Sequence, residues 1–291
     1  MKKKCVFVDV FTDVAYAGNG LAVFPDASGL SAIQMQRLAN EINYSETTFI
    51  VGRRDPEADF DIRIFTPANE LPFAGHPVLG TAFAILELFG LWPASKSILR
   101  LKTKAGVIPV EKRGPALWMT QNEPVFLGQH DNIDETASMV ELDAGDIRVD
   151  LPVEEVSTGN RVLIVPVKTL DAMARARGNA TQMAVHLDPA VLGPYLFSLE
   201  TTSSSKDVHT RFFAPHLGII EDPATGSAAG PLVGYLLKHR IFGERFEIEN
   251  EQGVEMGRPS RILMRGAIDN GRYLVGIGGT CCPVGNAEFE V

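Results

Sequence analysis

The sequence lacks the features of disulfide-rich, membrane-spanning and nucleic-acid-binding proteins. It has three cysteines, Cys5, Cys281 and Cys282, which cannot all pair, and adjacent cysteines rarely bridge each other. No apolar run approaches the roughly 18 to 20 residues of a membrane span, and the one after Lys4 is broken at Asp9, too early for a signal peptide. With 27 Lys and Arg against 36 Asp and Glu, the net charge is −9, which leaves no basic field for polyphosphate. We expect a cytoplasmic protein that binds neither nucleic acid nor membrane.

Two other kinds of site also lack their sequence signals. Apart from His76, which is considered below, the histidines show no metal-ligand spacing, so no metal site is predicted. They are His130, His186, His209, His216 and His239. The run Gly276–Gly279 is rich in glycine, but no strand–helix–strand unit follows it. It therefore indicates a strand and a turn rather than a dinucleotide site.

What the sequence does contain is an internal repeat. The segment Arg63–Ala82 holds an Arg-x-Phe-x-Pro strand, an acidic loop, a glycine and an apolar helix, and Arg211–Leu232 follows the same plan. The two arginines lie 148 positions apart, and Gly75 and Gly226 lie 151 apart, so one loop is three residues longer. This period is far too long for a solenoid. It indicates a duplication that produced two similar domains.

Periodicity and turn residues predict the elements of the first half. Ser31 is expected to cap a helix, and Pro77 to lie in the first turn of another that reaches about Phe89. Alternating apolar segments predict strands and one hairpin, at Val6–Val10, Ala22–Phe24, Thr47–Val51, Asp61–Phe65, Ile98–Thr103 and Val107–Val110.

The expected fold class is α/β (α+β) with two halves, residues 1–122 and 130–291. The polar segment Gln121–His130, with Pro124 and Gly128, is predicted to link them. The second half is expected to end in strands near Tyr273–Ile277 and Glu288–Val291. Whether the last strand crosses back to the first half is left open by the sequence.

Both halves place small residues at the start of a helix, around Gly75 and around Gly226 and Ser227. Glycine lets a ligand approach the backbone, and the free amides and helix dipole favour an anion. If the halves face each other, the two helix starts converge and would stabilise a carboxylate without Lys or Arg. The alternative is that these glycines only permit tight turns, but their duplication favours a small anionic substrate.

Three ionisable side chains accompany these loops: Glu46, His76 and Asp222. Glu46 lies at a loop edge before a predicted strand, and a carboxylate enclosed by apolar neighbours has a raised pKa that suits proton transfer in both directions. A solvated loop glutamate is the alternative. His76, beside a helix start, would be a neutral hydrogen-bonding group.

These motifs resemble the PhzF-like isomerases of phenazine biosynthesis. The resemblance rests on Phe65–Pro77 (FTPANELPFAGHP) and Glu221–Leu232 (EDPATGSAAGPL), and spans nearly the whole chain. One difference is Gly18-Asn19-Gly20, where the family has Gly-Asn-Pro. The resemblance implies a diaminopimelate-epimerase-like fold with two pseudo-symmetric domains, each a curved mixed sheet around a central helix.

The resemblance also implies an activity, a partner and roles for residues. The implied enzyme is a homodimer without cofactor that shifts a proton to turn an enol into a ketone, as in isomerisation of trans-2,3-dihydro-3-hydroxyanthranilate. Glu46 matches the general acid/base, and His76 and Asp222 match polar residues of the catalytic cleft. The implied substrate-binding residues are Asn19, Ser45, Gly75, Gly226 and Ser227.

Two alternatives remain. The same fold carries amino-acid racemases and epimerases with two opposed cysteines just before the helix-start glycines. Here those positions hold Ala74 and Thr225, so a single carboxylate that returns the proton to the same face fits better. The second alternative is a non-catalytic protein that binds a small ligand in the same cleft.

Overall fold

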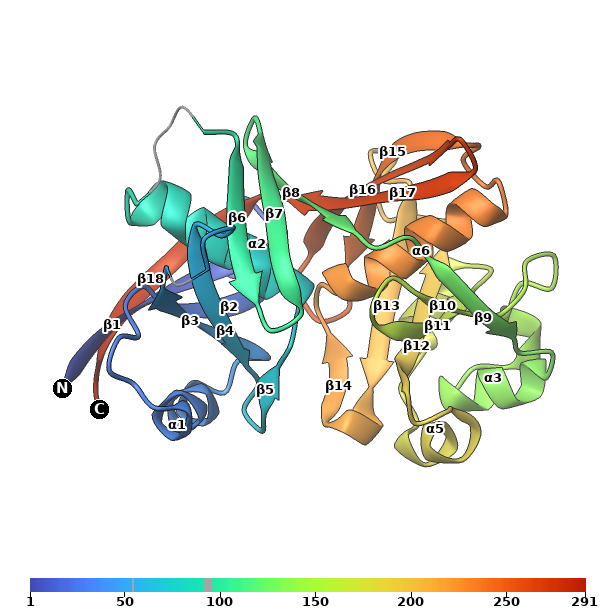
Figure 1. The fold of residues 1–291 in the computed structure, drawn as a ribbon. Helices are drawn as coiled ribbons and strands as arrows, with labels where there is room; N and C mark the ends of the chain where they lie inside the picture. The colour runs from blue at the N-terminus through green and yellow to red at the C-terminus, as the bar shows by residue number, and fades with distance from the viewer. Residues whose placement is uncertain (54, 92–95) are drawn as a thin grey trace. The chain divides into compact units, whose positions relative to one another are not determined.

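Each half of the chain folds into a mixed sheet packed on one buried helix (Figure 1). The computed structural model describes residues 1–53, 55–91 and 96–291. The chain divides into unit 1, residues 1–119 with 278–291, and unit 2, residues 120–277. Unit 1 therefore consists of two separate segments, whereas unit 2 is continuous.

Unit 1 is built around one ladder of strands. From one edge the order is β18, β1, β2, β3, β4, β6, β7 and β8, and β5 is added beside β4. The pairs β2–β3 and β4–β6 are parallel and the others antiparallel. Its elements are β1 (Lys2–Val10), β2 (Asn19–Phe24), α1 (Ala32–Ile42), β3 (Glu46–Gly52), β4 (Phe60–Phe65), β5 (Glu70–Leu71), α2 (Gly75–Phe83), a π-helix (Ala84–Leu88), β6 (Ile98–Thr103), β7 (Gly106–Arg113), β8 (Ala116–Gln121, which crosses the boundary) and β18 (Cys281–Glu290).

Unit 2 repeats this ladder as β9, β10, β11, β12, β13, β15 and β16, with β14 beside β13. Again the third and fifth pairs, β11–β12 and β13–β15, are parallel. The predicted duplication is therefore present in the strand pairing. Its elements are β9 (Val125–Gln129), α3 (Ile133–Met139), a 3-10 turn (Ala144–Asp146), β10 (Glu154–Ser157), β11 (Arg161–Pro166), α4 (Leu170–Arg175), α5 (Ala180–His186), β12 (Val191–Ser198), β13 (Val208–Ala214), a 3-10 turn (Pro215–Leu217), β14 (Ile219–Asp222), α6 (Gly226–Lys238), β15 (Arg245–Gln252), β16 (Ser260–Asp269) and β17 (Arg272–Gly279, which also crosses the boundary).

The helices α2 and α6 are the central helices of their units. Both are rich in small and apolar residues and are buried along nearly their whole length, as expected for a helix that is apolar on all sides. Gly80 shows how tightly α2 packs, because a Cβ there would lie 2.5 Å from Leu21 Cδ2 of β2 and 2.7 Å from Val10 Cγ2 of β1. The predicted diaminopimelate-epimerase-like architecture is thus confirmed within each unit.

Helix α1 begins as the sequence predicts. Ser31 accepts a hydrogen bond from the Gln34 amide, and the Gln34 side chain accepts one from the Ser31 amide, which completes a capping box. The helix ends at Asn43, whose left-handed backbone returns the chain toward β3. The end of α1 at Asn43 therefore fixes the position of the turn that leads to Glu46, the first residue of β3.

The irregular structure predicted for the linker Gln121–His130 is wrong in its second half, which is a strand. Residues Val125–Gln129 form β9, which pairs antiparallel with β10, with a register shift between Glu155 and Val156. The strand is exposed along most of its length, so Pro124 and Gly128 at an edge strand mimic the composition of a loop.

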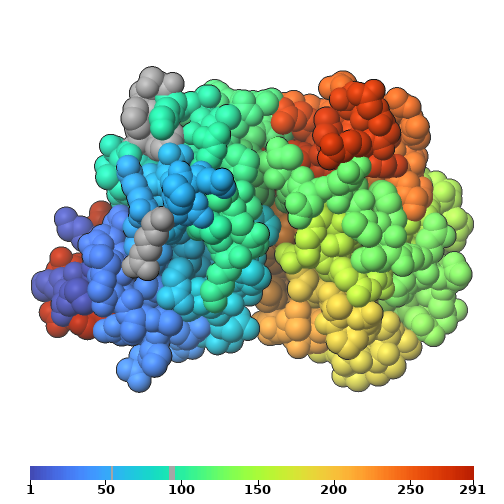
Figure 2. Space-filling model, viewed as in Figure 1, coloured from blue at the N-terminus to red at the C-terminus, as the bar shows by residue number. Residues whose placement is uncertain are grey.

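The last strand, β18, lies in unit 1. It pairs antiparallel with β1, with Lys2 opposite Glu290 at one end and Val10 opposite Cys281 at the other. It is longer than the predicted strand Glu288–Val291. The ends of the chain are adjacent, since the Met1 amino group donates to the Val291 carbonyl at 2.7 Å. Figure 2 shows these blue and red segments side by side on the surface of unit 1.

Candidate functional site

In unit 1, four predicted site residues come together from three elements. Glu46 is the first residue of β3 and pairs with Leu21, and Asn19 begins the neighbouring strand β2. Ser45 precedes Glu46 in the turn after α1, and His76 is the second residue of α2. The parallel pairing of β2 and β3 brings the starts of both strands to one edge, where α2 also begins.

The side chains of this cluster are linked by polar contacts. His76 Nε2 lies 3.5 Å from Glu46 Oε2, and His76 Nδ1 lies 3.4 Å from Asn19 Nδ2. Ser45 Oγ donates to Asn19 Oδ1 at 3.2 Å. Asn19 and His76 are buried, at 2% and 5% exposure. A histidine with one nitrogen toward an amide and the other toward a carboxylate can hold or pass a proton beside Glu46.

Burial gives Glu46 the properties of an acid/base group. Its side chain is 16% exposed. Removal from water raises the pKa of Glu46 from the ordinary 4.5 to about 7, and a hydrogen bond from Ser45 opposes this shift. Both protonation states are therefore populated near neutral pH, the condition for a group that removes a proton and returns it.

The start of α2 supplies backbone donors beside these side chains. Ala74 is the N-cap residue and has an extended backbone, but its methyl group offers no hydrogen bond to the first turn. Gly75, the first helical residue, is buried. The first-turn amides and the helix dipole create a positive potential next to Glu46 and His76, which suits an anionic group of a ligand.

In unit 2, the predicted residues Asp222, Gly226 and Ser227 lie around the start of α6. Asp222 ends β14, and its carboxylate Oδ2 accepts a hydrogen bond from Thr225 Oγ1 at 2.6 Å. Thr225 is the N-cap of α6. The carbonyl of Gly226 accepts from Gln121 Nε2 at 2.8 Å, and Ser227 is half-buried at the second helical position.

Sequence reasoning missed Gln252 and the role of Thr225 in this group. Gln252 is fully buried, and its amide bonds the Asp222 carbonyl and both the amide and the hydroxyl of Thr225. Thr225 was visible as a cap-type residue inside the acidic motif. Gln252 gave no local signal, because β15 brings it to β13 from far along the chain.

The structure places the three thiols away from the positions of a two-cysteine racemase. Cys5 belongs to β1 and Cys281 and Cys282 to β18, and all three are unpaired. Burial raises the pKa of each thiol, that of Cys5 to about 12. A thiol is a base only as the thiolate, so these cysteines are poorly suited to proton abstraction near neutral pH.

The other histidines mostly pair with nearby acidic or amide side chains. His209 lies between Glu251 and Glu255 at 2.8 and 2.9 Å, and His239 lies 3.0 Å from Glu154. Within residues 1–53, 55–91 and 96–291, no group of three His, Cys, Asp or Glu side chains could hold a metal ion. In the same residues, no helix is long and apolar enough to cross a membrane.

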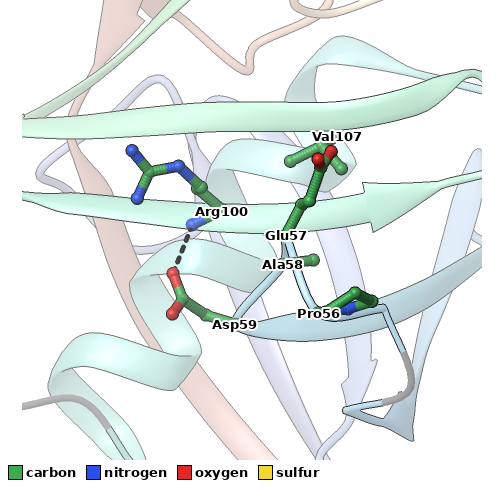
Figure 3. A pocket seen from close by; sticks show the side chains of 6 residues that line it. All are labelled: Pro56, Glu57, Ala58, Asp59, Arg100 and Val107. Carbon is green, nitrogen blue, oxygen red and sulfur yellow. Dashed lines mark hydrogen bonds between the residues drawn. The ribbon is translucent and has the colours of Figure 1, made fainter.

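One surface depression in unit 1 contains none of the predicted residues. It has a volume of about 490 Å³ and is lined by Pro56, Glu57, Ala58, Asp59, Arg100 and Val107. Figure 3 shows the Asp59 carboxylate accepting from the Arg100 amide, a contact of 2.9 Å that joins the loop before β4 to β6. This contact fixes the loop, and the depression lacks an acid/base pair like that of Glu46 and His76.

Comparison with solved structures shows that the fold is the one shared by PhzF-family proteins and a hydroxyproline epimerase. A hydroxyproline epimerase from Agrobacterium vitis has a TM-score of 0.59 at 13% identity, covering 99% of this chain and 92% of its own, which shows the shared fold alone. A Bacillus anthracis protein of the PhzF family has a TM-score of 0.92 at 30% identity, with 100% of both chains covered.

Sequence comparison identifies the family. The profile of the PhzC-PhzF family, described as phenazine biosynthesis-like protein, matches residues 8–287. The chain belongs to this family. It is 37% identical over 265 residues, 89% of each chain, to a Pseudomonas aeruginosa protein named trans-2,3-dihydro-3-hydroxyanthranilate isomerase. The resemblance read from the two motifs is confirmed.

Proposed function

We propose that the protein is a cofactor-independent isomerase that moves a proton within a small carboxylate-bearing substrate. The observation that carries this proposal is the Glu46 carboxylate, buried beside His76 with its pKa raised to about 7. The name of the Pseudomonas aeruginosa relative, at 37% identity, supports the same reaction class and suggests trans-2,3-dihydro-3-hydroxyanthranilate as the substrate.

In the proposed reaction the ionised Glu46 removes a proton from a substrate carbon and returns it at another position of the same molecule. The carboxylate returns to its starting state, so the reaction needs no net donor or acceptor. His76, 3.5 Å away, stabilises the charge that Glu46 gains and loses. The first-turn amides of α2 around Gly75 are proposed to bind the substrate carboxylate, with Asn19 and Ser45 as polar contacts. Asp222, Gly226 and Ser227 stay predictions for the same reaction.

The test is proton NMR of trans-2,3-dihydro-3-hydroxyanthranilate in heavy water, with the wild-type protein and Glu46→Gln. We expect the starting signals to disappear with deuterium entering the product, and the variant to lose about 10³-fold in rate. Glu41→Gln, the same change at an exposed residue of α1, is the matched control and should react like the wild type.

Each outcome separates the proposal from its alternatives. Full activity of Glu46→Gln would remove Glu46 from the reaction. An unchanged substrate with saturable binding to the wild type would favour the ligand-binding alternative. A racemase would instead exchange the α-proton of an amino acid, and the positions and raised pKa values of the thiols disfavour the two-cysteine form of that chemistry.

Two further proposals rest on the sequence and its resemblance. We propose that the protein works in the cytoplasm and that it is a homodimer. Cell fractionation tests the first, and sedimentation of the purified protein tests the second, with a mass of twice 31.6 kDa expected.

A further inference from the structure

A fully buried polar network lies behind Asp222 in unit 2. Tyr195 of β12, Thr210 of β13, and Asn250 and Gln252 of β15 are each 0% exposed. The Tyr195 hydroxyl donates to Gln252 Oε1 at 3.0 Å and accepts from Asn250 Nδ2 at 3.1 Å. Thr210 Oγ1 donates to Asn250 Oδ1 at 2.9 Å. Burying this many polar groups is unfavourable unless each one has a hydrogen-bond partner, so we asked what the network contributes.

The equivalent network is absent from the same ladder positions of unit 1. The register of β13 with β15, compared with that of β4 with β6, matches Thr210 to Ile62 and Gln252 to Thr103. Two positions earlier on β15, Asn250 corresponds to Leu101, an apolar core residue. One copy of the fold is therefore built without the polar network, so the ladder itself does not require it.

The hydrogen bonds of Gln252 have a defined direction. Its Nε2 donates to the Asp222 carbonyl at 2.8 Å and to Thr225 Oγ1 at 2.9 Å, and its Oε1 accepts from the Thr225 amide at 3.1 Å. Because Thr225 Oγ1 accepts from Gln252, the one proton of that hydroxyl is directed to Asp222 Oδ2, 2.6 Å away. A hydroxyl that donates to a carboxylate makes a short, charge-assisted hydrogen bond.

We propose that Gln252 and Thr225 are positioning residues for Asp222. Gln252 commits the Thr225 hydroxyl proton to the Asp222 carboxylate, and the carboxylate is thereby held in one orientation before the substrate arrives. Preorganised groups stabilise a transition state because they need not reorient during the reaction. The inference rests on the proposed function, in which Asp222 takes part in the reaction.

The test compares Thr225→Val, which keeps the shape but removes the hydroxyl, with Thr225→Ser, which keeps the hydroxyl. We expect Thr225→Val to lower kcat about 10- to 100-fold with KM changed less than about threefold, since the loss is one of orientation. Thr225→Ser should remain within about threefold of the wild type. Thr136→Val removes a buried hydroxyl of α3 and is the control for stability loss alone, with kcat unchanged.

A second measurement does not depend on the substrate. Crystal structures of both variants should show the Asp222 carboxylate turned from its wild-type orientation in Thr225→Val and retained in Thr225→Ser. If Thr225→Val does not fold, Thr225→Ala removes the same hydroxyl without adding bulk and is tested in its place.

The two arms separate failure of the inference from failure of the proposed function. If the wild type does not isomerise the substrate, the proposed function fails, and the crystal structures still decide whether Thr225 orients Asp222. An unmoved carboxylate in Thr225→Val, or a kcat equal to that of the wild type, overturns the inference. A kcat loss shared by Thr136→Val, or not rescued by Thr225→Ser, shows a structural role and also overturns it.

Discussion

The two units share one strand ladder but differ at the position of the proposed acid/base. In unit 1 Phe49 of β3 pairs with Arg63 of β4, and in unit 2 Leu196 of β12 pairs with Arg211 of β13. Three residues before Phe49 is Glu46, and three before Leu196 is Gly193. A Cβ at Gly193 would lie 2.1 Å from the Phe213 carbonyl oxygen, so no side chain fits there. Duplication preserved the scaffold, while only one copy has room for the carboxylate.

The acidic residue of the repeated motif behaves in the opposite way, because it is kept in both units. Glu70 accepts two hydrogen bonds from Arg63, each 2.7 Å, and Glu221 accepts two from Arg211, each 2.8 Å. The Arg63 side chain is 27% exposed, whereas that of Arg211 is 2% exposed. The Arg–Glu pair present in both units therefore supports the fold, whereas the Glu46 carboxylate has no counterpart in unit 2 and is the candidate for chemistry.

The largest expected effect compares these two arginines. Arg211→Leu would leave Glu221 without its guanidinium partner in a buried setting, so we expect a loss of about 3 to 5 kcal/mol in the free energy of unfolding. Arg63→Leu should lose only about 1 to 2 kcal/mol, since Glu70 keeps Lys104 and Arg63 is itself more exposed than Arg211. Urea denaturation followed by circular dichroism measures both, and equal losses would contradict the difference in burial.

The second prediction tests the crowding at Gly193. Gly193→Ala should lower the free energy of unfolding by about 2 to 3 kcal/mol, because the new methyl group displaces the backbone of β13. The matched change in unit 1 is Glu46→Ala, which should change the free energy of unfolding by less than about 1 kcal/mol at pH 4, where Glu46 is protonated in the folded protein. Thermal unfolding of both variants decides this, and a neutral Gly193→Ala would show that the two positions are equally open.

The third prediction follows from the raised pKa of Glu46. The folded protein binds this proton up to about pH 7, while the unfolded chain loses it near pH 4.5, so this group lowers the stability as the pH rises from 4.5 to 7. Glu46→Gln removes the ionised form and should be more stable than the wild type by about 1 to 3 kcal/mol at pH 8. Urea titrations at pH 4 and pH 8 check it, and an equal difference at both pH values would exclude a raised pKa.

The smallest effect concerns Lys104, which lies 2.6 Å from Glu70 and is 56% exposed. In unit 2 Arg211, the counterpart of Arg63, also donates to the carbonyls of Met173 and Ala176 in the interior. Lys104→Ala should cost less than about 1 kcal/mol, because exposed ion pairs contribute little. Differential scanning calorimetry at low and high salt measures this loss. A larger loss that persists in high salt would mean that Lys104 stabilises the Arg63–Glu70 pair as strongly as the buried carbonyls stabilise Arg211.

Local signals in the sequence were sufficient for the elements with strong end signals. Ser31 indicates the start of α1, and Pro77 the first turn of α2. Strand β9 was missed because an exposed edge strand has no apolar alternation, and because its partner β10 is distant in sequence.

The residues of the candidate site also divide into those with a local sequence signal and those placed by pairing between distant strands. Glu46 and His76 lie in motifs that are readable as linear sequence. The buried position of Gln252, by contrast, follows from parallel pairing between β13 and β15, which leaves no local pattern. The Glu46 pKa also depends on surroundings contributed by several elements, so only its direction was predictable.

The pairing of β1 with β18 affects how the protein folds during its synthesis on the ribosome. All of unit 2 is one continuous segment, and it emerges before residues 281–290 are made. Strand β1 is made before the rest of its ladder, yet one of its two edges stays without a partner until translation reaches β18. The unit that carries Glu46 is therefore completed after unit 2, and chaperones that shield unpaired strand edges would act on β1 in the nascent chain.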